Sequence, residues 1–130
     1  MSAGLIHRST TYSCDEVIER LKAATATQPM GVVAHINGQA AAARRGLDAA
    51  CDQILEVFQP DFAVRVWAAC KEAGLDIPIR FHVHADGGRT LVSYRPPSRV
   101  FAPYAHPELD RLGAELDPIF AAILERALSS

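Results

Sequence analysis

The chain has 130 residues, of which 49% are hydrophobic and 22% charged, and its formal net charge is −2. These values fit one globular domain, residues 1–130, and exclude a disordered chain. The charge balance argues against nucleic-acid and membrane partners, which need a basic footprint. The sequence shows neither an apolar run of about 20 residues nor a signal peptide, so we expect a cytoplasmic protein.

The N-terminal segment predicts a strand followed by a helix. Residues 5–12 are short and rich in Ser and Thr, which suggests a first strand. Ser13 and Glu16 then have the spacing of a capping box, in which the serine side chain caps the helix N-terminus. Apolar residues at helical spacing follow, so we expect a helix from Cys14 to about Ala26.

The next segment predicts a strand and a short helix. Gly31–Ile36 is a β-branched run between turn residues and indicates a buried strand. Asn37–Gly38 is a turn signal. The alanine-rich stretch 39–45 ends in two arginines and favours a short helix, with Gly46 as the residue that closes it.

The middle of the chain predicts a strand, a helix and a hairpin. Gln53–Phe58 is apolar enough for a third strand, and a helix opens at Pro60 and ends near Gly74. Apolar and polar residues alternate over 79–85, which is the period of a strand with one buried face. A turn at 86–88 returns the chain as a second strand, 89–95.

The C-terminal segment predicts an irregular stretch and then a helix. Residues 98–107 have no clear period, whereas 108–128 carry an apolar stripe at helical spacing. Gly113 and Pro118 interrupt that stripe, so two shorter helices or one kinked helix are both compatible with it. The order β-α-β-α-β-α-β-β-α predicts an α+β fold, with one mixed sheet of about five strands and helices packed on a face.

Several segments, in order and spacing, resemble the domain-of-unknown-function family 302. They are Glu19–Ala24, Gly31–Ile36, the alanine-rich helix ending at Leu47, Leu75–Arg80, the turn 86–88 and Val92–Pro97. Leu75–Arg80 is similar to the family's Leu-Asp-Leu-Pro-Leu-Lys stretch, and Val92–Pro97 to its Val-Ser-Tyr-Asn-x-Pro ending. The resemblance covers a core of about 5–100, followed by a helical segment of about 107–128. It implies a compact α+β fold that commonly forms homodimers, and it implies no established activity.

Two positions depart from the family pattern. Family members often carry Ile-Asp-His after the second strand, where this chain has Ile36, Asn37 and Gly38. They also tend to have Phe-Gly-Asn-Pro after the third strand, where this chain has the shorter Phe58–Pro60. A family function that depends on the acid and the histidine would be lost or changed here.

His82 and His84 are the sharpest chemical signal in the sequence. At positions i and i+2 of a strand, both rings project from the same face. Imidazole nitrogens suit zinc, copper, nickel or haem iron, but two ligands do not complete a site. A homodimer would bring two such pairs together. The alternative is an ordinary polar strand face, which Arg80 on the same face supports because its charge repels a cation.

Other candidate residues carry weaker signals. His35 lies in an apolar strand, where a hydrogen-bonded structural role competes with joining His82 and His84. Arg80, Arg89 and Arg95 surround the hairpin and would suit a small anion, or they are a solvated strand edge. The three cysteines, Cys14, Cys51 and Cys70, match no zinc spacing. We interpret Cys14 and Cys70 as small core residues rather than redox or metal groups.

Two functions remain open on the sequence. The first is a homodimeric small-ligand-binding domain, with Arg80, His82, His84 and His35 as candidate ligand-binding residues and a metal or haem as a possible cofactor. The second is a structural or protein-interaction module without a small-molecule site, in which the stretch from Val100 to Tyr104 covers the sheet or docks a partner. An enzyme is the weakest reading, because no nucleophile elbow or phosphate-binding loop is present.

Overall fold

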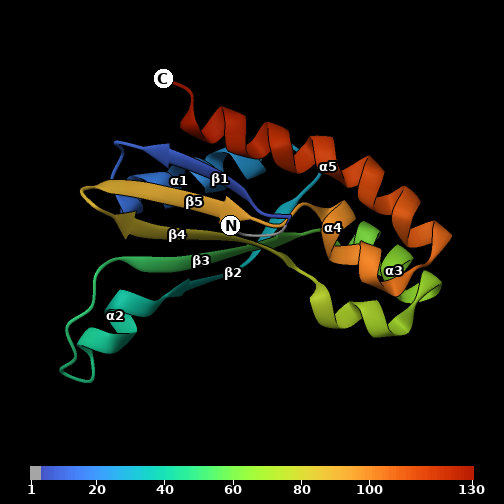
Figure 1. Ribbon diagram of the computed structural model, residues 1–130, viewed down its shortest axis with the longest axis horizontal. Coiled ribbons are helices and arrows are strands. Elements are labelled where there is room, and N and C mark those ends of the chain that lie inside the picture. The colour runs from blue at the N-terminus through green and yellow to red at the C-terminus, as the bar shows by residue number, and fades with distance from the viewer. Residues whose placement is uncertain (1–3) are drawn as a thin grey trace.

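A five-stranded sheet with helices along one face forms the protein (Figure 1). The computed structural model describes residues 4–130. The strands are β1 (Ile6–Thr10), β2 (Gly31–Asn37), β3 (Asp52–Phe58), β4 (Ile79–Asp86) and β5 (Arg89–Tyr94). The helices are α1 (Cys14–Thr25), α2 (Gly38–Ala43), α3 (Pro60–Ala69), η1 (Lys71–Asp76), α4 (Pro97–Phe101), η2 (Ala102–Tyr104) and α5 (Pro107–Leu128). The predicted α+β class and the predicted order of elements are confirmed.

The sheet is antiparallel throughout, in the order β1-β5-β4-β3-β2. The expectation of a mixed sheet was wrong. The helix-linked strands β2 and β3, and likewise β3 and β4, lie side by side but run antiparallel. Helix α1 carries the chain from β1 at one edge of the sheet to β2 at the other edge, so these two strands do not pair.

The core lies between the sheet and helices α1 and α5, which pack against each other. The alternation predicted for β4 is confirmed, since Ile79, Phe81 and Val83 are buried while Arg80 is exposed. The ring of Phe81 lies 5.0 Å from that of Tyr94 and 6.0 Å from that of Phe120, measured between centroids. Phe81 thereby joins two strands to α5.

The start of α1 is fixed in two ways. The Oγ atom of Ser13 accepts a hydrogen bond from the backbone N–H of Glu16, which confirms the predicted N-cap. Cys14, the first residue of α1, forms a disulfide with Cys51, which directly precedes β3. The interpretation of Cys14 as a free core thiol was therefore wrong. Its sulfur is buried, as expected, but 37 positions of sequence separate it from a partner that spacing could not identify.

The strand β2 is an exposed edge strand, not a buried one as predicted. Val32, Val33 and Ile36 are all exposed on it. A β-branched run fits an edge strand as well as a central one, so composition alone did not distinguish the two. Asn37 caps α2 directly, because its Oδ1 accepts from the backbone N–H of Ala40.

The segment expected to be irregular contains two short helices, α4 and η2. After it, α5 continues through Gly113 and Pro118 as one helix, which excludes the alternative of two shorter helices that the sequence left open. Asp117 of α5 accepts hydrogen bonds from the backbone N–H and the Oγ of Ser98, at 2.9 and 2.5 Å. This carboxylate holds α4 against α5.

Gly113 is required where α4 crosses α5. A Cβ atom at this position would lie 2.6 Å from the Cα of Ser98. We expect Gly113→Ala to lower the free energy of unfolding by about 1–3 kcal/mol, because the two backbones must move apart. Urea denaturation measures the loss, and Ala121→Ser on the exposed side of α5 is the control, with an expected change within about 0.5 kcal/mol. An unchanged Gly113→Ala variant would contradict the close packing of these helices.

Candidate functional site

The face of the sheet opposite α1 and α5, here called the open face, carries the candidate residues. Strand pairing places one residue of each strand in a row across it: His7, Ser93, His82, Ile54 and Ile36. The Nδ1 of His7 and the Oγ of Ser93 share a hydrogen bond of 2.7 Å. The open face is therefore a mixed surface in which polar groups lie beside aliphatic ones.

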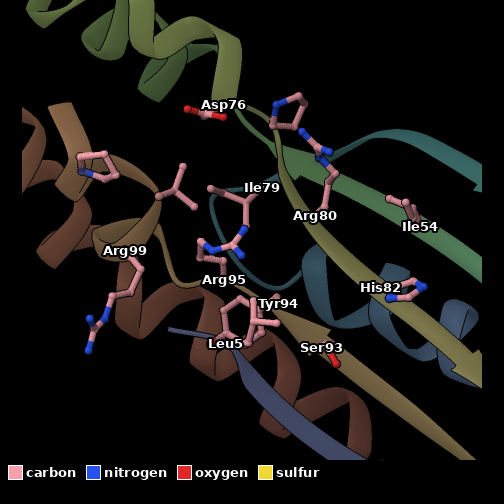
Figure 2. A pocket seen from close by; sticks show the side chains of 13 residues that line it. Leu5, Ile54, Asp76, Ile79, Arg80, His82, Ser93, Tyr94, Arg95 and Arg99 are labelled. Carbon is pink, nitrogen blue, oxygen red and sulfur yellow. The ribbon is translucent and has the colours of Figure 1, made fainter. Parts of the chain in front are cut away.

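A hollow of about 660 Å³ lies at one end of the open face (Figure 2). Its lining comes from the ends of three neighbouring strands and from the segments that follow or precede them. These residues are Leu5, Ile54, Asp76, Pro78, Ile79, Arg80, His82, Ser93, Tyr94, Arg95, Arg99, Val100 and Pro103. Ligand sites in proteins are commonly concave, with volumes of about 300–1,000 Å³. The hollow is of that size.

The two histidines predicted to share a face do so. The rings of His82 and His84 stack with centroids 4.7 Å apart. The Nε2 of His82 donates to Asp52 at 2.9 Å, and the Nδ1 of His84 donates to the backbone carbonyl of Ala85 at 2.9 Å. Each ring therefore keeps one nitrogen unengaged, and of the pair only His82 lines the hollow.

His35 lies on the other face of the sheet. It pairs with the buried residue Leu55, so its ring is directed to the side of the helices. Its Nε2 donates to the Oε1 of Gln53 at 2.6 Å, and Gln53 in turn donates to Asp15 of α1. The structure thus gives His35 a partner in a hydrogen-bond chain and does not bring it to His82 and His84.

The three hairpin arginines separate into two places. Arg89 begins β5 beside the turn, and its Nε donates to the Oγ of Ser9. Arg80, near the start of β4, and Arg95, directly after β5, both lie far from the turn and both line the hollow. Arg99 of α4 joins them there. No sequence pattern singled out Arg99, because α4 itself was not predicted.

The stretch from Val100 to Tyr104 has three different roles. Val100 lines the hollow, Phe101 is fully buried in the core, and the hydroxyl of Tyr104 donates a hydrogen bond to the Oδ2 of Asp76. This bond joins η2 to η1 at the rim of the hollow. The hydrogen bond to Asp76, and secondarily desolvation, raises the pKa of Tyr104 to about 12.

The Tyr104 contact predicts an alkaline transition. The raised pKa means that the folded state holds this proton more tightly, so the stabilisation is complete below pH 10 and is lost as the pH rises towards 12. We expect Asp76→Asn to lower the pKa of Tyr104 towards 10. Tyrosinate absorbance during a pH titration, compared with that of Tyr104→Phe, measures the shift. An unchanged titration of Asp76→Asn would show that the carboxylate does not hold the phenol.

The sequence matches the family described as "Domain of unknown function DUF302" over residues 6–128. The chain belongs to the DUF302 family. The crystal structure of an uncharacterized conserved DUF302 protein from Bacillus stearothermophilus is similar over 97% of this chain and 99% of that chain. The TM-score is 0.87 and the sequence identity is 24%, which shows a shared fold. No curated protein matches the chain.

The DUF302 match includes the C-terminal helix α5 as well as the sheet. One of the two departures from the family pattern has a structural role in this member. Asn37, which stands where the resemblance implies an acid, caps α2 with its side chain. The neighbouring Gly38 has the backbone carbonyl of Asp52 3.0 Å from the place of a Cβ atom, so a histidine there would crowd β3.

A second surface of this DUF302 protein is apolar. A groove of about 260 Å³ between β2, α3 and η1 is lined by residues that include Val33, Ala63, Trp67 and Ile77. Val33 is 59% exposed and Trp67 46% exposed.

Among residues 4–130, no helix is long and apolar enough to cross a membrane.

Proposed function

We propose that this DUF302 protein is a homodimeric small-ligand-binding domain whose ligand site is the hollow on the open face. The observation that carries the proposal is the hollow itself, in which aliphatic side chains and charged groups line one concave surface of suitable size. The polar groups come from β4, β5 and α4, which the core and the Ser98–Asp117 hydrogen bonds hold in place. A preorganised site of this kind binds without a large cost in ordering.

The homodimer is proposed for the open face. Its aliphatic residues Ile36, Ile54 and Leu91 lie on the side of the sheet away from α1 and α5. A second copy packed against this face would bury these aliphatic residues and close the open side of the hollow. Sedimentation equilibrium tests this arrangement: Ile36→Glu should dissociate the dimer, whereas Val64→Glu on exposed α3 should not. If the wild-type protein is monomeric at micromolar concentration, the proposed homodimer is refuted.

A metal or haem held by His82 and His84 is a narrower form of the same proposal. Each ring donates one N–H to an oxygen, as metal-ligating histidines do, and keeps its other nitrogen for a ligand. Within residues 4–130, no group of three or more His, Cys, Asp and Glu side chains is placed to hold a metal. A complete site therefore needs imidazoles from two copies.

Elemental analysis and an absorption spectrum test this metal or haem site. The protein should be untagged and kept from nickel columns. Stoichiometric metal or a Soret band that disappears in the His82→Ala/His84→Ala double variant would support the site. Unchanged metal content in that variant would refute it.

The ligand site itself is tested by titration with two probes, octan-1-ol and octanoate, followed in ¹H–¹⁵N correlation spectra. Resonances of residues that line the hollow should shift in the wild type and in Val64→Trp. They should not shift in Ile54→Trp, which fills the hollow from β3. If neither probe moves these resonances in the wild type, the small-ligand function fails.

The alternative function, an interaction module without a small-molecule site, is supported by the exposed apolar groove beside Trp67. Exposed apolar surface of this kind often marks a contact with another protein. The same titration separates the two functions, because an interaction module predicts no shifts at the hollow.

A further inference from the structure

Two arginines line the hollow from neighbouring segments of the hairpin, Arg80 on β4 and Arg95 directly after β5. His82 of β4 pairs with Ser93 of β5 in an antiparallel ladder. Arg80 is two residues before His82, and Arg95 is two residues after Ser93, just beyond the end of β5, and both line the hollow. Like charges that share one site repel each other. An anion between them would remove that repulsion.

The arginines that line the hollow differ in whether a carboxylate already engages them. Glu56 is paired with Arg80, with 3.7 Å between Nε and Oε2, and Asp76 accepts the hydroxyl proton of Tyr104. Within residues 4–130, Arg95 and Arg99 have no ion-pair partner. Two guanidiniums that are free to meet a ligand therefore border the hollow, which suits an anionic ligand.

Beside the polar Ser93 and His82, the lining is apolar. Leu5, Ile54, Ile79 and Val100 contribute aliphatic side chains, and two prolines lie near the rim. Figure 2 shows the guanidinium of Arg95 over the middle of the hollow, close to Ile79, with Arg99 extending away from it. A ligand that contacts Arg95 with its charged end would lie with the remainder of its body against aliphatic carbon.

The backbone offers little for a phosphate. Phosphate sites commonly use free N–H groups at the N-terminus of a helix. The helix that borders the hollow, α4, has only five residues, and the N–H of Ser98 in its first turn is already bonded to Asp117. Side-chain guanidinium forks remain, and their geometry matches a carboxylate as well as a phosphate.

We propose that the hollow binds an organic monoacid, in which Arg95 and Arg80 hold a carboxylate and the aliphatic lining holds an apolar body. This inference rests on the proposed ligand-binding function and adds the chemical class of the ligand. It assigns Arg95 the principal role in recognising the charge, because Arg80 already has a carboxylate partner and Arg99 extends away.

The test compares octanoate with octan-1-ol, which has the same chain and no charge. In the wild type, octanoate should bind at least about tenfold more tightly, as expected for one charge-assisted hydrogen-bond pair. Arg95→Gln should bring the two affinities to within about twofold. Arg95→Lys should keep part of the preference because it keeps the charge. Arg89→Gln, at the far end of the hairpin, is the matched control and should leave the preference unchanged.

The outcomes separate this inference from the function on which it rests. If both probes bind at the hollow with equal affinity, the ligand site stands and the monoacid is refuted. A preference for octanoate that survives in Arg95→Gln would also refute the assignment. If octyl phosphate binds more tightly than octanoate, the class is a phosphate ester instead. If neither octanoate nor octan-1-ol binds, both proposals fall.

Discussion

Loss of the disulfide is expected to lower the free energy of unfolding by about 4 kcal/mol, the value that loop-closure entropy gives for a cross-link of this span. The cross-link joins Cys14 to Cys51 across a sequence separation of 37 and so ties the start of α1 to the start of β3. The segment between them contains the exposed strand β2, whose residues are all exposed or half-buried and so give it little anchorage of its own. Without the bond, this segment gains the most freedom in the unfolded chain.

The measurement is urea denaturation of Cys51→Ser and of the wild type with and without dithiothreitol. Cys70→Ser is the control, because Cys70 is a free, partly buried cysteine at the end of α3. It should change the stability by less than about 1 kcal/mol. Equal stability of the oxidised and reduced wild-type protein would contradict the prediction.

Phe81→Ala should have an effect of similar size, about 3–5 kcal/mol. The Phe81 ring is fully buried between Tyr94 and Phe120, so its removal opens a cavity where β4, β5 and α5 meet. Arg80 and His82 flank it in sequence on the opposite face. We therefore expect Phe81→Ala to disturb the arrangement of the residues that line the hollow as well as the packing of the core.

Phe81→Leu keeps the prediction testable if the Phe81→Ala variant fails to fold. Leucine keeps most of the apolar volume, so the loss should be smaller than for alanine and the protein should remain folded. Denaturation curves of both variants give the free energies. A loss below about 1 kcal/mol for Phe81→Ala would show that the three elements do not depend on this ring.

Local signals predicted most elements of the fold. Ser13 at the start of α1 and the alternation along β4 each act over a few residues, so the sequence displays them directly. The strand order and the Cys14–Cys51 disulfide depend instead on which distant segments meet. Neither periodicity nor spacing contains that information.

The candidate site shows the same division. Arg80 and His82 were found because one strand carries both, and strand alternation places them on one face. Arg95 was grouped with Arg89 by its nearness in sequence, yet Arg89 begins β5 whereas Arg95 lies just beyond its other end. Arg99 and Asp76 reach the hollow only through tertiary packing of α4 and η1.

The position of β1 also affects how the protein is made. This strand leaves the ribosome before the other four strands of the sheet, and within residues 4–130 it pairs with β5, with Ile6 opposite Tyr94. Its hydrogen bonds cannot form until most of the chain has been synthesised, whereas β4 and β5 pair as soon as their short turn is complete. Contacts so distant in sequence slow folding. The edge of β1 therefore stays unpaired until β5 has emerged, and a chaperone or a second nascent chain can reach it in that interval.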